Sequence, residues 1–140
     1  MRAISTVFLA FSIFLGTGCA MQQTRPEKIS YVIQVSDNDP AKWNLALNNA
    51  KNIQQDLGAG NTQVEIVAYG PGLGMMKFDS PVANRIQEAE QAGVKINACG
   101  NTMKAQKVTK DDLAPGVGVV PSGVTEIGSR QQQGWSYIRP

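Results

Sequence analysis

Two cysteines, Cys19 and Cys99, are the residues of this 140-residue chain with the widest range of possible chemistry. Cys19 follows an apolar N-terminal stretch typical of an export signal, so Cys99 has no other cysteine available for an intrachain disulfide. Exported proteins ordinarily pair their cysteines. A lone thiol at Cys99 is therefore a buried small side chain, a link to another molecule or a reactive nucleophile.

The absence of histidine limits the chemistry that a reactive Cys99 can perform. A chain without histidine contains no Ser-His-Asp or Cys-His nucleophile pair and no histidine ligand for zinc. Asp37 and Asp39 are better explained by helix capping before Pro40 than by metal binding. The net charge of +2 gives no electrostatic reason to expect nucleic acid as a partner. We expect no metal, no cofactor and no hydrolase activity.

The N-terminus predicts export and divides the chain into three parts. Arg2 and the short apolar run 7–15 are typical of a signal peptide, because a membrane span needs about 20 apolar residues. Small residues before Cys19 favour lipoprotein-type cleavage at that cysteine, with lipidation of Cys19; cleavage after Ala20 is the alternative. The predicted organisation is a signal peptide (1–18), a tether (19–28) and one domain (29–140).

The sequence of the domain predicts strands that alternate with helices. β-rich runs predict strands, and capping residues, prolines and apolar residues at helical spacing predict helices between them. The expected strands are 29–35, 63–69, 94–98, 117–120 and 135–138. The expected helices are 40–57, one from Pro81 to about Gly93, a short piece after Cys99, and one that Pro121-Ser122 starts and that runs to about Gln133. This alternation predicts an α/β fold with a mostly parallel sheet of about five strands.

This order of elements positions the candidate site residues. Ligands gather at the carboxyl ends of strands in open α/β sheets, and the loops after the first three predicted strands would form one rim if these strands are neighbours. The rim candidates are Ser36, Asp37, Gly70, Gly72, Gly74, Cys99, Gly100 and Asn101. Cys99 would stand at a helix start, where the helix dipole and backbone amides stabilise a thiolate. Gly100 would leave the sulfur open to approach. A buried, inert Cys99 is the alternative.

The glycine-rich segment Gly70-Pro-Gly-Leu-Gly has two interpretations. It is either a backbone nest that holds an anion or a turn that requires positive φ, and the turn is favoured. Its GxGxG spacing and its position after the second strand do not fit a dinucleotide fingerprint.

Several segments together resemble the DsrE/DsrF-like family, in particular its small, stand-alone exported bacterial branch. They are Ala98-Cys-Gly-Asn-Thr102, Tyr69-Gly-Pro-Gly-Leu-Gly74, the asparagine-rich first helix and the ending Gln133-Gly-Trp-Ser-Tyr-Ile-Arg-Pro140. The resemblance covers residues 28–140. It implies a flavodoxin-like three-layer fold and self-association as trimers or hexamers. In better-known relatives a cysteine after the third strand carries a persulfide, a role that the resemblance transfers to Cys99.

Our leading hypothesis from the sequence is a protein of the bacterial cell envelope, periplasmic and lipid-anchored at Cys19, in which Cys99 carries or transfers sulfane sulfur. Without a second cysteine, turnover requires an external thiol acceptor. The alternatives are a non-catalytic oligomer that holds a small ligand at Ser36, Asp37, Gly72 and Cys99, and a purely structural envelope protein.

Overall fold

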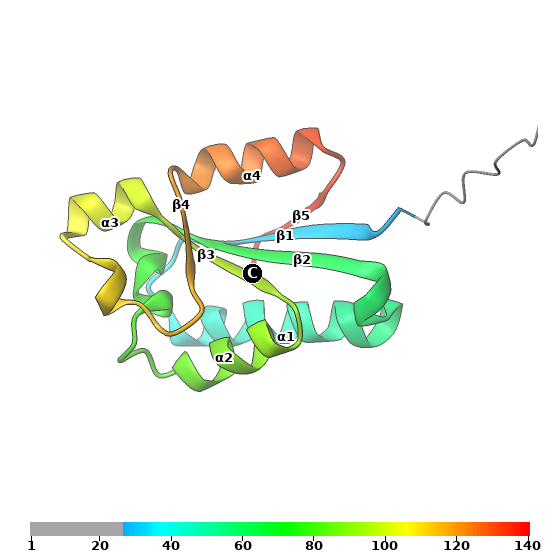
Figure 1. The fold of residues 1–140 in the computed structure, drawn as a ribbon, viewed down its shortest axis with the longest axis horizontal. Coiled ribbons are helices and arrows are strands. Elements are labelled where there is room, and N and C mark those ends of the chain that lie inside the picture. Colours follow the sequence, from blue (N-terminus) through cyan, green and yellow to red (C-terminus); the bar gives the residue numbers. More distant parts are fainter. Residues whose placement is uncertain (1–26) are drawn as a thin grey trace, which may run out of the picture.

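Five short parallel strands form one sheet at the centre of the protein (Figure 1). The computed structural model describes residues 27–140, so the predicted signal peptide, Cys19 and most of the tether lie outside the described residues. The strands are β1 (Ile29–Val35), β2 (Thr62–Ala68), β3 (Lys95–Cys99), β4 (Gly118–Val120) and β5 (Ser136–Ile138). Their order in the sheet is β4-β3-β2-β1-β5, with every neighbouring pair parallel.

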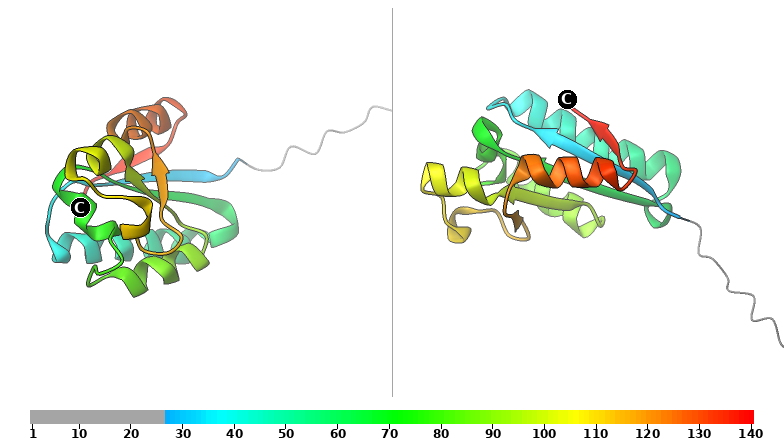
Figure 2. Two further views of the ribbon diagram at one scale, coloured as in Figure 1. Left: turned by 60° about the vertical axis from the view of Figure 1, so that its left-hand side comes forward. Right: turned by 90° about the horizontal axis from the view of Figure 1, so that it is seen from above.

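The helices make two outer layers around this sheet. They are α1 (Pro40–Leu57), α2 (Ala83–Gln91), α3 (Gly100–Gln106) and α4 (Gly123–Gln132), with short 3-10 helices η1 (Ala59–Asn61), η2 (Gly70–Met76) and η3 (Lys110–Asp112). α1 and α2 lie below the sheet in Figure 1 and α4 lies above it, while α3 and η2 stand at the carboxyl ends of the strands, as the views of Figure 2 also show. The expected flavodoxin-like α/β fold is confirmed.

Local sequence signals explain where α1 begins and ends. The Asp39 side chain accepts a hydrogen bond from the Ala41 N–H at 2.8 Å, and Pro40 occupies the first turn, where its missing N–H costs nothing. Gly58 ends the helix with φ of 86°. Capping of α1 therefore accounts for Asp39, as predicted.

Two connecting segments differ from the sequence prediction. The helix expected from Pro81 begins only at Ala83, because residues 80–82 form a turn in which the Ala83 N–H donates to the Ser80 carbonyl. The glycine-rich segment, for which we favoured a turn with positive φ, is the 3-10 helix η2. Of its glycines only Gly70 has positive φ, and Leu73 is fully buried. Burial of apolar side chains between the glycines pulls this segment onto the sheet.

Successive side chains in a strand point to opposite faces of the sheet, and the strands contribute differently to the two faces. In β3, Ile96 and Ala98 join the large cluster under α1 and α2. Cys99 is one residue further along and lies on the other face, beside Gly123 at the start of α4, where an added Cβ would lie 3.1 Å from the Cβ of Cys99. The register of β3 therefore assigns the thiol to the α4 face.

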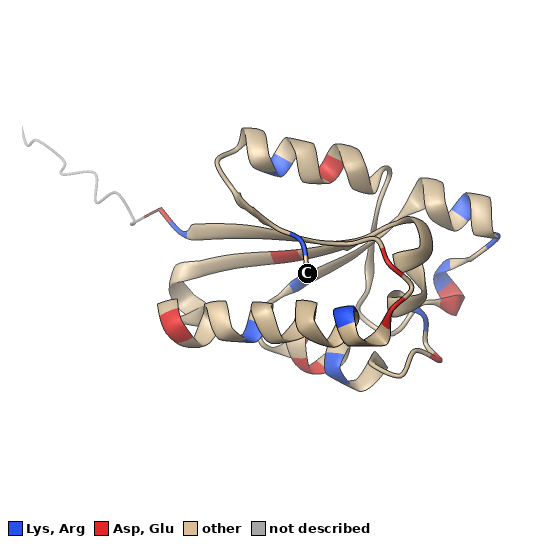
Figure 3. Cartoon of the chain, turned by 180° about the vertical axis from the view of Figure 1, so that it is seen from behind, with Lys and Arg blue, Asp and Glu red and all other residues tan. Residues whose placement is uncertain are grey.

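The surface carries charges of both signs. Lys, Arg, Asp and Glu are interspersed over the helices and loops in Figure 3, as the small net charge of +2 implies. Within residues 27–140, no helix has the length and apolar character needed to cross a membrane.

Candidate functional site

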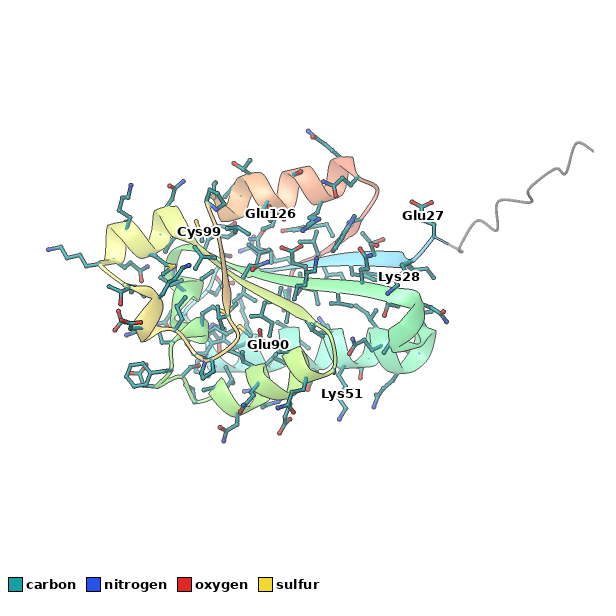
Figure 4. All side chains as sticks on the ribbon, in the orientation of Figure 1. Glu27, Lys28, Lys51, Glu90, Cys99 and Glu126 are labelled. Atoms are coloured by element: carbon teal, nitrogen blue, oxygen red, sulfur yellow. The ribbon has the colours of Figure 1, made fainter. Side chains whose placement is uncertain are left out.

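Cys99 stands at the junction of β3 and α3, as the sequence predicts. It is the last residue of β3 and the N-cap of α3, and Figure 4 places it between α3 and the start of α4. Because β3, β2 and β1 are neighbours, the loops after these three strands do share one edge of the sheet.

Cys99 lies beside the starts of two helices, since it is the N-cap of α3 and packs against Gly123 at the start of α4. Burial raises the pKa of the Cys99 thiol, but this effect is outweighed by hydrogen bonds from the Thr102 hydroxyl and from the backbone N–H groups of Gly123, Thr102 and Asn101. The pKa therefore lies below its ordinary value of 9.0. Among the residues that the structure describes, no charged side chain contributes to this shift. Neutral dipoles alone favour the thiolate.

A backbone hydrogen bond joins the start of α3 to the segment before α4. The Asn101 N–H donates to the Pro121 carbonyl oxygen at 3.1 Å. Gly123, which the sequence analysis did not name, is thus a close neighbour of Cys99, and Thr102, named there only within the family motif, contributes to the lowered pKa.

Two glycines allow this close packing. A Cβ atom on Gly123 would lie 3.1 Å from the Cβ of Cys99, and one on Gly100 would lie 3.2 Å from the Val120 carbonyl oxygen. Gly100 therefore lets α3 pack against the end of β4, whereas we had expected it to leave the sulfur open. Cys99 is only 5% exposed, so a reagent that reaches it must be small.

Gly70 is tied directly to the thiol site. Its N–H donates to the Thr102 hydroxyl oxygen at 3.0 Å, and its carbonyl accepts from the Gln106 side chain at 3.0 Å. Gly70 has φ of 53°, a conformation that favours glycine. The structure thus brings Cys99, Asn101 and Gly70 together, with Thr102 between them.

The other two glycines of η2 serve packing. A side chain on Gly72 would collide with the backbone carbonyl of Val35, and a Cβ on Gly74 would lie 3.2 Å from the Trp43 ring. Close contact with β1 and α1 accounts for both glycines without a ligand.

The polar residues after β1 already have partners. We had expected Asp37 to cap α1, but it binds Lys42 at 2.9 Å and lies 3.8 Å from Arg139. The Lys42 hydrogen bond holds the pKa of Asp37 below the ordinary value. The Ser36 hydroxyl accepts from the Gln34 side chain at 3.1 Å. Within residues 27–140, no group of three potential metal ligands forms.

Comparisons with solved structures identify similar proteins. MTH1491, a protein of unknown function from Methanobacterium thermoautotrophicum, shares 36% identity with a TM-score of 0.77 over 81% of this chain and 100% of its own. BT1422 from Bacteroides thetaiotaomicron, also of unknown function, shares 18% identity (TM-score 0.65, 79% of this chain and 94% of that one). The ychN protein of E. coli shares 11% identity, with a TM-score of 0.64 over 81% of this chain and 99% of its own. The last two show the fold alone.

Comparison with family sequences is more specific. No curated protein matches the chain, but the sequence model of the DsrE/DsrF-like family matches residues 28–140. This span includes every described strand and helix, together with Cys99 and the glycine segment. The chain therefore belongs to the DsrE/DsrF-like family.

Proposed function

We propose that the protein accepts sulfane sulfur on Cys99, holds it as a persulfide and passes it to an external thiol. The observation that carries this proposal is the position of Cys99 at the carboxyl end of β3, next to the starts of α3 and α4, where the pKa of its thiol lies below the ordinary value. A stabilised thiolate is the species that attacks sulfur. Membership of the DsrE/DsrF-like family supports a role of the sulfur-relay type.

The chemistry is a pair of sulfur exchanges without net oxidation. The Cys99 thiolate attacks the outer sulfur of a persulfide or polysulfide donor, a new S–S bond forms at Sγ, and the donor's inner sulfur leaves with the bonding electron pair as a thiolate. An acceptor thiolate then attacks the outer sulfur of the Cys99 persulfide, and Sγ leaves. Because a low-pKa thiol is the better leaving group, the same donors that stabilise the thiolate favour release.

The packing around Cys99 selects the kind of donor. With 5% of the residue exposed, the sulfur is open to the slender end of a sulfur chain rather than to a bulky electrophile. Gly123 and Tyr69 leave little room on the α4 side, since even one added carbon at Gly123 would lie 3.1 Å from each of the Cβ atoms of Cys99 and Tyr69. Inorganic polysulfide is therefore the donor of first choice.

We also propose that this chemistry takes place in the bacterial envelope, on a self-associating protein held by a lipid at Cys19. The N-terminal pattern before Cys19 supports the anchor. The test is membrane partitioning: the wild type should co-sediment with membranes, and Cys19→Ala should be released or misprocessed. Size-exclusion chromatography with light scattering on the detergent-solubilised protein tests the self-association.

The sulfur-carrier role is tested by intact mass. The processed protein is exposed to inorganic polysulfide, desalted and weighed beside the Cys99→Ser variant. We expect a gain of one sulfur on the wild type alone, reversed by a small thiol that accepts it. A wild type that stays unmodified while its thiol reacts with a small alkylating reagent would contradict the proposal.

A further inference from the structure

A small cavity lies between α1 and α2, which run side by side under the sheet (Figure 1). Side-chain contacts tie the two helices together at its two ends. At one end Arg85 of α2 binds Asn48 of α1, and at the other the Gln54 side chain donates to the Ala92 carbonyl at 2.8 Å. The stretch of α1 between these ties, from Asn48 to Gln54, is about 9 Å long. The cavity that they enclose has a volume of about 180 Å³.

The floor of the cavity is apolar. Leu47 and Val94 are buried members of the large core cluster, and Ala89 packs against that cluster. An apolar cavity of about 150 Å³ is large enough to bind benzene, whereas pockets for drug-sized ligands begin at about 300 Å³. The size and the lining therefore fit an apolar group about as large as benzene.

Two cationic side chains, Arg85 and Lys51, stand at the rim of the cavity. The Arg85 guanidinium donates to the side-chain oxygens of Asn44 and Asn48, to the latter at 2.6 Å. Both acceptors are neutral, and within residues 27–140 neither Arg85 nor Lys51 forms an ion pair. A guanidinium has five N–H donors, so Arg85 keeps donors and its full charge for a further acceptor.

This arrangement explains two residues of the asparagine-rich first helix. Asn44 and Asn48 are one turn apart and lie on the same side of α1. The Asn44 side-chain nitrogen donates to the Pro40 carbonyl at 2.9 Å, which leaves its oxygen to face Arg85. An aspartate at either position would neutralise the guanidinium. The asparagines hold Arg85 in place without an opposing charge.

Glu88 limits the charge of a ligand that the cavity can hold. It lines the same cavity, almost one turn beyond Arg85 on α2, and it pairs with neither cation. The charged side chains of the rim are thus two cations and one carboxylate. A single negative charge is attracted to Arg85 and Lys51, whereas a second one would be repelled by Glu88.

We propose that the cavity between α1 and α2 binds a small monocarboxylate, with its apolar part against Leu47 and Val94 and its carboxylate between Arg85 and Lys51. Arginine suits this ligand because its planar N–H groups match the geometry of a carboxylate. The cavity lies on the α1 and α2 face of the sheet, away from Cys99, and Figure 4 places Lys51 on the side of the molecule opposite α4. The inference is therefore independent of the sulfur-carrier role.

The test is a fluorine NMR titration of the processed protein with para-fluorophenylacetate. The comparison ligand is para-fluorophenylacetamide, which keeps the ring and lacks the charge. We expect the carboxylate to bind at least about tenfold more tightly than the amide, since charged hydrogen-bond partners are the stronger ones. Cys99→Ser should bind the carboxylate like the wild type, so a failure of the sulfur-carrier role would leave this result unchanged.

Four further variants locate the binding site. Arg85→Gln should weaken binding of the carboxylate about tenfold, and Lys51→Gln about two- to threefold, because Lys51 is exposed. Glu88→Gln should tighten binding about twofold by removing a repulsive charge. Lys104→Gln is the control, since it removes one cation from α3, and it should match the wild type.

Glu88→Gln is the most informative variant, because damage to the fold does not tighten binding. Equal affinity for the carboxylate and the amide would overturn the proposal, as would the absence of binding at millimolar concentration. If Arg85→Gln does not fold, Lys51→Gln and Glu88→Gln decide the question, since neither side chain forms an ion pair in the part of the chain that the structure describes. Unchanged affinity in both of these variants would also overturn the proposal.

Discussion

The two faces of the sheet differ in the polarity of their buried side chains. On the α1 and α2 face, twenty buried apolar residues of the described chain form one continuous cluster, among them Ile33 and Ile66. On the α4 face, the buried apolar cluster has three members: Val32, Val67 and Ile127. Much of the second face is polar, with Glu65 and Gln34 buried there.

A network around Arg130 replaces the missing apolar contacts. Its Nε donates to the fully buried Glu65 at 2.6 Å, another nitrogen binds Glu126 at 2.9 Å, and the guanidinium lies 4.6 Å from the centre of the Trp135 ring. Asn97 donates to the other oxygen of Glu65 at 2.8 Å. α4 is thus fixed to the sheet by directional contacts.

The two faces contribute differently to stability and to the thiol site. The α1 and α2 face is stabilised by apolar packing, which does not depend on the direction of individual contacts. The α4 face is stabilised by hydrogen bonds and ion pairs, which require defined distances and angles. The same geometry brings Gly123, the first residue of α4, beside Cys99, whose pKa the Gly123 backbone helps to lower. A residue that holds α4 therefore affects the thiol, and a residue of the apolar face does not.

Breaking the Arg130 network should have the largest effect on stability. Arg130→Met would leave the Glu65 carboxylate buried with Asn97 as its remaining partner, which costs about 3–5 kcal/mol of unfolding free energy. Urea denaturation measures the loss. Glu126→Gln is the matched control, because it removes the charge of the partly exposed partner of the same guanidinium and should cost less than about 1 kcal/mol. Equal losses in the two variants would refute a special role for the buried pair.

A second pair of variants separates stability from thiol chemistry. Gly123→Ala places a carbon 3.1 Å from the Cβ atoms of Cys99 and Tyr69 and should cost about 1–2 kcal/mol by overpacking. It should also raise the pKa of Cys99, since α4 and its amide must move away. Ile66→Val on the opposite face should cost about 1 kcal/mol and leave the thiol unchanged. Thiolate absorbance measures the pKa of Cys99 and urea denaturation measures the unfolding free energy. A change in the pKa of Cys99 in Ile66→Val would contradict the comparison.

The pH dependence of stability isolates the thiol from the rest of the α4 face. The pKa of Cys99 is lower in the folded protein than its ordinary value of 9.0, so the unfolded chain binds more protons between these two values. The stability that the thiolate contributes is complete above about pH 9 and is lost as the pH falls through the folded pKa. The difference in unfolding free energy between wild type and Cys99→Ser should therefore grow with rising pH. A difference that stays constant would show an unperturbed thiol.

Most of the fold could be predicted from the sequence because its signals are local. Capping by Asp39, the glycine after α1 and the apolar runs of the strands act within a few residues, so the bounds of β1 and α1 were predicted correctly. The order of the strands could not be predicted, since it depends on which strands pair across the whole chain. The start of α2 was predicted two residues early, because Ser80 closes a turn instead of capping the helix.

The candidate site could be predicted only in part for the same reason. Cys99 and Gly70 were identified from residue type and from their positions at strand ends. Gly123 was missed and Thr102 was named only within the family motif, because a threonine or a glycine in a helix's first turn is ordinary until the fold brings another segment beside it. Glu65 was also missed, since it sits in an apolar strand and its partner Arg130 lies 65 residues away.

The smallest effect should come from Gly128, the other glycine of α4. A Cβ there would meet no atom within 4 Å, and Gly128 is in the helix interior, where alanine is favoured over glycine by about 0.5–1 kcal/mol. Gly128→Ala should therefore stabilise the protein by about that amount and leave the titration of Cys99 unchanged, as thermal denaturation and thiolate absorbance would measure. Set beside Gly123→Ala, it makes the same chemical change five residues away on the same helix with the opposite sign. A loss of stability in Gly128→Ala would contradict this comparison. It would mean that the side of α4 that faces away from the sheet is as sensitive to an added carbon as the side that packs on the sheet.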